Sequence, residues 1–246
     1  MIPNLAISIS ALPKSGKNHF SCTSPDPIRF YCFNGGADYV ASKFPNKKIE
    51  VLNYRLPIVE STDDEWAAPI WEGFSKQVKT DIAEGKFQTY VLDTSTEVEN
   101  ICQQAVLETA KDEAADKGKD KKRLATNDFL ARNLKMKAIY DQVKNSGANL
   151  IVLQYLKEEW VKSAGEKNSL PTGKLVPDGW KRNESQCDVN FEFSRKPPVT
   201  EKGKKVVHVV AVVVSSRFDD FSNTITGETL TDPTWDDVVA LVLGGD

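Results

Sequence analysis

Histidine and cysteine are scarce in this sequence, and neither is spaced for metal binding or nucleophilic catalysis. The 246 residues contain two histidines, His19 and His208, and four cysteines that form no C-x-x-C pair. Without such pairs, neither a structural zinc site nor a disulfide framework is indicated, and free thiols are expected. Neither histidine has a nearby Ser or Cys in an arrangement typical of a catalytic base. These chemistries are therefore not predicted.

Long hydrophobic runs and a strong net charge are also missing. No apolar run approaches the ~20 residues of a membrane span, and the N-terminus lacks the pattern of a secretion signal. The net charge is -3, so a surface for nucleic acid would have to come from local clusters of Lys and Arg. We expect a soluble, cytoplasmic protein with one domain over residues 1–246, although the length also allows two small domains.

The most informative motif is a near match to a phosphate-binding loop at residues 11–18, Ala-Leu-Pro-Lys-Ser-Gly-Lys-Asn. In the full pattern, G-x-x-x-x-G-K-[ST], backbone N–H groups surround the phosphates, the Lys reaches the β/γ-phosphates and the hydroxyl binds Mg²⁺. Gly16 and Lys17 fit, whereas Ala11 replaces the first glycine and Asn18 replaces the hydroxyl residue. The predicted nucleotide-binding residues are Ala11, Pro13, Lys14, Ser15, Gly16, Lys17, Asn18 and His19.

Strand-like and helix-like segments alternate along the chain, which predicts an α/β fold with a mainly parallel sheet covered by helices on both faces. Antiparallel strands are expected toward the C-terminus. The predicted strands are 5–10, 28–33, 48–53, 87–93, 149–155, 187–193 and 205–214. The predicted helices are 18–24, 63–84, 97–111, 128–145 and 235–243, and mobile loops are expected near 111–126 and 157–184.

Polar residues at predicted strand ends suggest one site, because ligands bind at the carboxyl ends of parallel strands. Asp93 ends an apolar strand and is a candidate Mg²⁺ ligand together with Asn18, although Asp93 could instead cap the following helix. Gln154 ends another strand and could sense the γ-phosphate or cap the sheet edge. Arg217, after the last long strand, is either a charge stabiliser for its own or a neighbouring site, or an ordinary surface arginine.

The order of ALPKSGKN, FNGG, TYVLD, NLIVLQYLKEEW, TGKLVPDGW and SSRF resembles the phage-encoded, core-only RecA-type ATPases of the AAA-like P-loop group. Members are associated with single-strand annealing and recombination. The resemblance implies ATP and Mg²⁺ as cofactors, with Lys17 as the Walker A lysine, Asp93 as the Walker B carboxylate and Gln154 linking nucleotide to DNA. Asn18 and Asn34 depart from the family pattern, and both departures bear on hydrolysis.

The resemblance also implies binding of single-stranded DNA, assembly into a homo-oligomer in the (host) cytoplasm and a single-stranded DNA-binding protein as a further partner. Two tryptophans, Trp160 and Trp180, are available for stacking on bases. The expected DNA-binding residues are Trp160, Lys162, Lys167, Lys174, Lys181 and Arg182. Two alternatives remain, a P-loop protein without turnover that serves as a binding or assembly module, and a nucleotide or nucleoside kinase.

Overall fold

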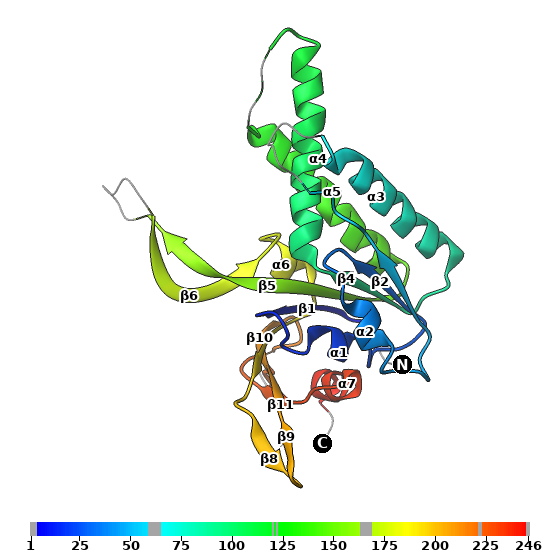
Figure 1. Cartoon of the computed structure of the whole chain (residues 1–246), viewed down its shortest axis with the longest axis vertical. Helices are drawn as coiled ribbons and strands as arrows, with labels where there is room; N and C mark the ends of the chain where they lie inside the picture. The colour runs from blue at the N-terminus through cyan, green and yellow to red at the C-terminus, as the bar shows by residue number, and fades with distance from the viewer. Residues whose placement is uncertain are drawn as a thin grey trace.

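A mixed β-sheet forms the centre of the computed structural model (Figure 1). The structure describes residues 4–58, 65–119, 121, 123–162, 169–220 and 223–244. Within these residues the strand order is β11-β10-β7-β1-β5-β4-β2-β3, β6 pairs with β5 as a ninth strand, and β8 and β9 form a separate pair. The strands from β3 to β7 in this order run parallel, whereas β6 and β10 run antiparallel to their neighbours. The predicted mainly parallel sheet is confirmed.

The element bounds agree with most of the predicted segments. The strands are β1 (Ala6–Ala11), β2 (Ile28–Cys32), β3 (Ile49–Asn53), β4 (Thr89–Asp93), β5 (Asn149–Val161), β6 (Leu170–Asp178), β7 (Val189–Arg195), β8 (Val199–Glu201), β9 (Lys204–Val206), β10 (Val209–Ser216) and β11 (Thr229–Thr231). The helices are α1 (Lys17–Ser21), α2 (Ala37–Ala41), α3 (Ala67–Glu84), α4 (Ser95–Ala115), α5 (Thr126–Asn145), α6 (Asn183–Gln186) and α7 (Trp235–Leu243). In the described part of the chain, none of these helices is both long and apolar enough to cross a membrane.

Helices cover both faces of the sheet, as the sequence predicts (Figure 1). On one face α3, α4 and α5 pack on the strands, and the α3 residues Trp71, Phe74 and Val78 form part of a buried cluster there. On the other face α1 and α7 contribute Phe20 and Trp235 to a second buried cluster. Because successive side chains of a strand point to opposite faces, the central strands must be apolar on both sides.

The prediction of a long loop at 157–184 is wrong. β5 continues to Val161 and pairs antiparallel with β6, with Glu158 opposite Leu175 and Trp160 opposite Pro171. Together, residues 157–161 and 170–178 form an arm that extends from the body of the molecule (Figure 1). The sequence does not predict the outer part of β5, because its side chains are mostly exposed and charged and form no apolar pattern.

Two other boundaries differ from the predictions. The strand predicted at 205–214 is divided, because Lys204–Val206 pairs with β8 and the sheet strand begins again at Val209. The charged segment at 111–126 is partly helical, because α4 runs to Ala115. Valine runs and mixed charges do not by themselves show where one strand turns into another or where a helix ends.

The start of α3 is held by a carboxylate from a neighbouring helix. The first N–H groups of a helix lack partners within the helix, and the N-cap residue Trp66 supplies no side-chain acceptor. Instead, the buried Glu108 of α4 accepts hydrogen bonds from the backbone N–H groups of Trp66, Ala67 and Ala68 at 2.7–3.1 Å. Glu108 therefore joins the two helices at a buried contact.

Replacing Glu108 should lower the stability of the protein more than replacing an exposed glutamate of the same helix. Glu108→Ala would leave several buried N–H donors without acceptors, and we expect a loss of about 3 kcal/mol in the free energy of unfolding, measured by urea denaturation. Glu113→Ala, at an exposed position of the same helix, is the matched control and should change stability by less than about 0.5 kcal/mol. Equal stability of the two variants would show that the cap contributes nothing.

Candidate functional site

The 11–18 loop leaves the end of β1 and returns the chain into α1, as a phosphate-binding loop requires. Gly16 has a φ of 84°, in the left-handed region that favours glycine. A Cβ atom at Gly16 would also lie 2.8 Å from Cγ2 of Val209, closer than real Cβ contacts. Both the backbone conformation and the close approach of β10 therefore require glycine at this position.

Lys17 is buried at the start of α1, with 6% of its surface exposed. Its Nζ donates hydrogen bonds to the backbone carbonyls of Ala11 at 3.1 Å and Leu12 at 3.3 Å, and lies 5.0 Å from the ring centroid of Tyr155. Burial lowers the pKa of Lys17 to about 8, and the negative charge of Asp93 opposes part of this shift. The ammonium is thus held at the loop by two backbone carbonyls, and within the described residues it has no direct ion pair with a carboxylate.

Asp93 ends β4 and is buried beside the loop. Asn18 donates to its Oδ2 at 2.8 Å, Asn34 donates to its Oδ1 at 3.2 Å, and the Cys32 thiol lies 3.7 Å from Oδ2. Burial raises the pKa of Asp93, while the two amides and the Lys17 charge oppose that rise. The N-cap of α4 is Thr94, so the alternative reading of Asp93 as that cap is wrong.

Asn18 connects the loop to Asp93 in place of the hydroxyl of the full motif. Its amide nitrogen is used by Asp93, and within the described residues no hydrogen bond is made to its amide oxygen. An amide oxygen and a carboxylate are both hard oxygen ligands that suit Mg²⁺. The described part of the chain has no cluster of three or more His, Cys, Asp or Glu side chains for a metal ion. A metal here would rely on these two residues and on phosphate oxygens.

Tyr155 is a site residue that the sequence reasoning missed. It follows Gln154 in β5 and pairs in register with Ala11, which places it beside the loop. Its hydroxyl accepts a hydrogen bond from Asn34 at 2.8 Å, so Asn34 bridges Tyr155 and Asp93. Burial raises the pKa of Tyr155. Its place next to Gln154 was a signal for this sheet edge, although successive side chains of a strand point to opposite faces and Gln154 therefore points away from the loop side.

Arg217 does not lie where the sequence predicted, and Gln154 lies at the predicted edge but inside its strand rather than at the strand's end. β5 continues past Gln154, which is buried inside the strand and accepts a hydrogen bond from Ser8 at 3.2 Å. Arg217 pairs with Asp188 at 2.5 Å, and Asp188 accepts from the backbone N–H of Ala6 at the start of β1. β10 runs antiparallel, so its end lies at the edge opposite the phosphate loop. A role for Arg217 in its own chain's site is therefore excluded.

The other predicted loop residues differ in exposure and in what their side chains contact. Pro13 and Lys14 are exposed and Ser15 is buried, so only Lys14 offers a second cation, from a backbone with φ of 65°. The side chain of His19 packs on Phe44, with ring centroids 4.9 Å apart. His19 can thus contribute its backbone N–H to the site while its ring supports α1.

The predicted DNA-binding residues lie mainly on or beside the β5–β6 arm. Trp160 is 58% exposed on β5, the exposed Lys174 belongs to the same arm, and the exposed Lys162 follows directly after β5. Lys181 and Arg182 are exposed where the chain enters α6, and Lys167 lies outside the described residues. The stacking role for Trp180 is wrong. Trp180 is 1% exposed, and its indole N–H donates to Asn133 at 2.9 Å.

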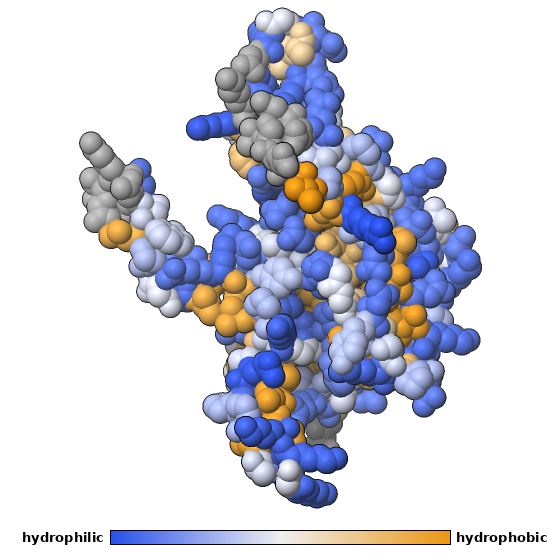
Figure 2. All heavy atoms as spheres, in the orientation of Figure 1, coloured by the Kyte–Doolittle hydropathy of each residue, from blue (hydrophilic) through white to orange (hydrophobic). Residues whose placement is uncertain are grey.

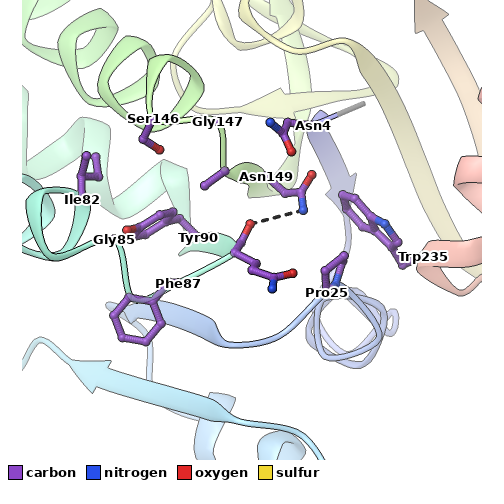
Figure 3. A pocket seen from close by; sticks show the side chains of 12 residues that line it. Asn4, Pro25, Ile82, Gly85, Phe87, Tyr90, Ser146, Gly147, Asn149 and Trp235 are labelled. Carbon is purple, nitrogen blue, oxygen red and sulfur yellow. Dashed lines mark hydrogen bonds between the residues drawn. The ribbon is translucent and has the colours of Figure 1, made fainter. Parts of the chain in front are cut away.

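A separate cavity of about 480 Å³ lies at the opposite edge of the sheet, where β4 and β5 begin (Figure 3). Phe87, Tyr90 and Trp235 line it together with Asn149, whose amide donates to the Gln88 carbonyl at 3.3 Å. None of the sequence-predicted site residues lines this cavity. This cavity is therefore separate from the phosphate-loop site, which lies at the other edge of the sheet.

No curated protein matches the sequence. Among solved structures, a KaiC-like protein from the hyperthermophilic archaeon Pyrococcus horikoshii OT3 is similar, with a TM-score of 0.47 and 9% identity over 92% of this chain and 84% of that one.

A family model described as an AAA domain matches residues 4–185, which include the phosphate loop, Asp93, Tyr155 and the arm. The match covers more than half of the chain. The observed sheet, with helices on both faces and a lysine loop after its first strand, is the RecA-like P-loop arrangement. The chain therefore belongs to this AAA-domain family of P-loop proteins.

Proposed function

We propose that this protein binds ATP at the 11–18 loop, hydrolyses it, and acts on single-stranded DNA in phage recombination, annealing or replication. The observation that carries the proposal is the buried Lys17 ammonium between the loop carbonyls, the Tyr155 ring and Asp93. A buried cation without a fixed anionic partner is costly, and a phosphate group supplies the missing negative charge. Homo-oligomer formation, a single-stranded DNA-binding partner and a cytoplasmic location belong to the same proposal.

The residues of the loop fit a nucleotide with its metal ion. Lys17 would bind the phosphates through its ammonium, and the backbone N–H groups of the loop would surround them. Asp93 and the free amide oxygen of Asn18 would hold Mg²⁺, directly or through water. When bound, the metal neutralises charge on the phosphate oxygens.

The second candidate is a nucleotide-binding module without turnover, and Asn34 favours it. In RecA-type proteins an acidic residue is expected near the end of the second strand, but residues 33–36 here are Phe-Asn-Gly-Gly. Asp38 accepts a hydrogen bond from Asn53 at 2.7 Å, which leaves Glu97, in the first turn of α4, as a candidate to activate the attacking water. Binding and turnover must therefore be tested separately.

The β5–β6 arm supports the DNA part of the proposal. The arm extends from the body (Figure 1) and carries the exposed residues Trp160 and Lys174, and aromatic side chains with cations are the usual means of binding single strands. Tyr155 lies on the same strand as Trp160, five residues earlier, so β5 connects the phosphate loop to the arm. Bound nucleotide is therefore expected to change the affinity for DNA through this strand without being required for DNA binding.

Lys17→Ala should abolish most nucleotide binding. Loss of a charge-assisted contact should weaken ATP affinity about 10- to 100-fold, measured by calorimetry with Mg²⁺ in the presence and absence of a single-stranded oligonucleotide. Lys76→Ala, at an exposed position of α3, is the control and should bind as the wild type does. DNA-stimulated turnover would exclude a small-molecule kinase. Equal ATP affinity of Lys17→Ala and wild type would contradict the proposed site.

Asn18→Thr should increase turnover, because threonine restores the hydroxyl of the full motif. We expect ATP hydrolysis to rise about tenfold, which corresponds to about 1.4 kcal/mol in the barrier, in a phosphate-release assay at saturating ATP. Asn18→Ala removes the amide without adding a hydroxyl and should not gain activity. If Asn18→Thr binds ATP but hydrolyses it no faster, the absent acidic residue at Asn34, rather than the absent hydroxyl, limits turnover.

A further inference from the structure

A second cavity, of about 950 Å³, lies between the β5–β6 arm and the sheet. Its walls include Trp160 and Leu175 of the arm and Lys181 after β6, and its floor is the face of β1, β5 and β7 that carries Ser10, Gln154 and Asn190. Figure 2 shows apolar residues at the base of the arm, close to this opening. The volume is within the range of small-molecule sites.

The floor of this cavity is polar although it is deeply buried. Ser8, Ser10, Gln154 and Asn190 are each less than 9% exposed. Ser8 pairs in register with Asn190, and Ser10 with Gln154, so the four side chains share one face of three adjacent strands. The opposite face of β1 carries Ile7 and Ile9, as expected for a strand in a covered parallel sheet. Packing alone would favour apolar residues on both faces.

Asn190 has an acceptor that nothing in the described residues satisfies. Its Nδ2 donates to the Glu184 carbonyl at 3.1 Å and to Ser215 Oγ at 3.0 Å. Because a carbonyl only accepts, these contacts fix which end of the amide is nitrogen. Oδ1 is buried without a partner in the described part of the chain. An orphaned buried acceptor is costly, which points to a ligand that donates a hydrogen bond.

Gln154 offers the complementary group. Its Oε1 accepts from Ser8 Oγ at 3.2 Å, and the described residues make no hydrogen bond to its Nε2. Gly179 faces this nitrogen, because a Cβ there would lie 3.1 Å from it. The floor residues thus include one unpaired buried acceptor, Asn190 Oδ1, and one unpaired donor, Gln154 Nε2. Three lysines and four glutamates line the cavity, so its charge selects neither a strong anion nor a strong cation.

We propose that this cavity binds an unpaired nucleobase. A base edge carries donors and acceptors that match Asn190 Oδ1 and Gln154 Nε2, and its flat faces suit Trp160 and the apolar Leu175 and Val214. A base in a duplex has its pairing edge occupied and does not fit. The base comes from a free nucleoside or from a single strand, and the strand source rests on the DNA-binding part of the proposed function. Neither source depends on nucleotide binding at Lys17.

The test compares oligonucleotides with and without bases. Fluorescence anisotropy measures binding of a labelled oligo-dA, an oligo-dC and an abasic strand of the same length, and calorimetry measures deoxyadenosine and deoxycytidine. All measurements are repeated in Lys17→Ala, so that binding at the phosphate loop is separated from binding in this cavity. Asn190→Leu removes the acceptor, and Val214→Trp fills the cavity from an exposed rim position. Val199→Trp, an exposed position on β8, is the matched control.

Wild type should bind the base-containing strands about tenfold tighter than the abasic strand. Asn190→Leu and Val214→Trp should lose that preference with unchanged affinity for the abasic strand, whereas Val199→Trp and Lys17→Ala should keep it. Nucleoside binding with the same sensitivity to the two variants supports the cavity with a free base as its ligand. No preference for bases in any probe, or a preference that survives in Val214→Trp, would overturn the proposal. A preference that persists when ATP binding fails separates this inference from the nucleotide site.

Discussion

The buried ammonium of Lys17 is the interaction on which the candidate site depends. An ammonium taken out of water needs acceptors, and here it has two backbone carbonyls and an aromatic face, while Asp93 on another strand favours its charge without a direct ion pair in the described residues. These groups meet because β1, β4 and β5 run parallel, so that the ends of β1 and β4 lie at the same sheet edge as Tyr155 within β5. The register of the central strands, and the helices that cover them, therefore determine whether Lys17 can be charged and positioned.

The polar network around Lys17 differs from a full phosphate-loop site in its amides. Asn18 and Asn34 both donate to Asp93, so the carboxylate is held by neutral groups on each side. These hydrogen bonds orient Asp93 without an added charge, and Asn34 also donates a hydrogen bond to the Tyr155 hydroxyl. Because Tyr155 lies on β5, the strand that forms the arm, the phosphate edge and the arm share one continuous element.

Much of this site could be predicted from the sequence, because its main residues belong to local sequence patterns. The Gly-Lys pair after an apolar strand and the carboxylate at the end of TYVLD predicted the loop, Asp93 and their common edge. The features that the sequence did not predict depend on contacts between distant parts of the chain. The arm has no apolar periodicity, the direction of β10 decides that Arg217 lies at the wrong edge, and packing against Asn133 and Tyr140 decides that Trp180 is buried. Tyr155 and the polar floor under the arm likewise depend on register between distant strands.

The pKa of Lys17 tests the central claim most directly. Nuclear magnetic resonance of the lysine side chains, with Lys17→Ala used to assign the Lys17 signal, follows the titration of Lys17 in the free protein and after addition of Mg²⁺ and ATP. Burial lowers the pKa of Lys17 to about 8 in the free protein, and bound phosphate should raise it because the anion stabilises the ammonium. A pKa near the ordinary value of 10.5 that nucleotide does not change would contradict the account.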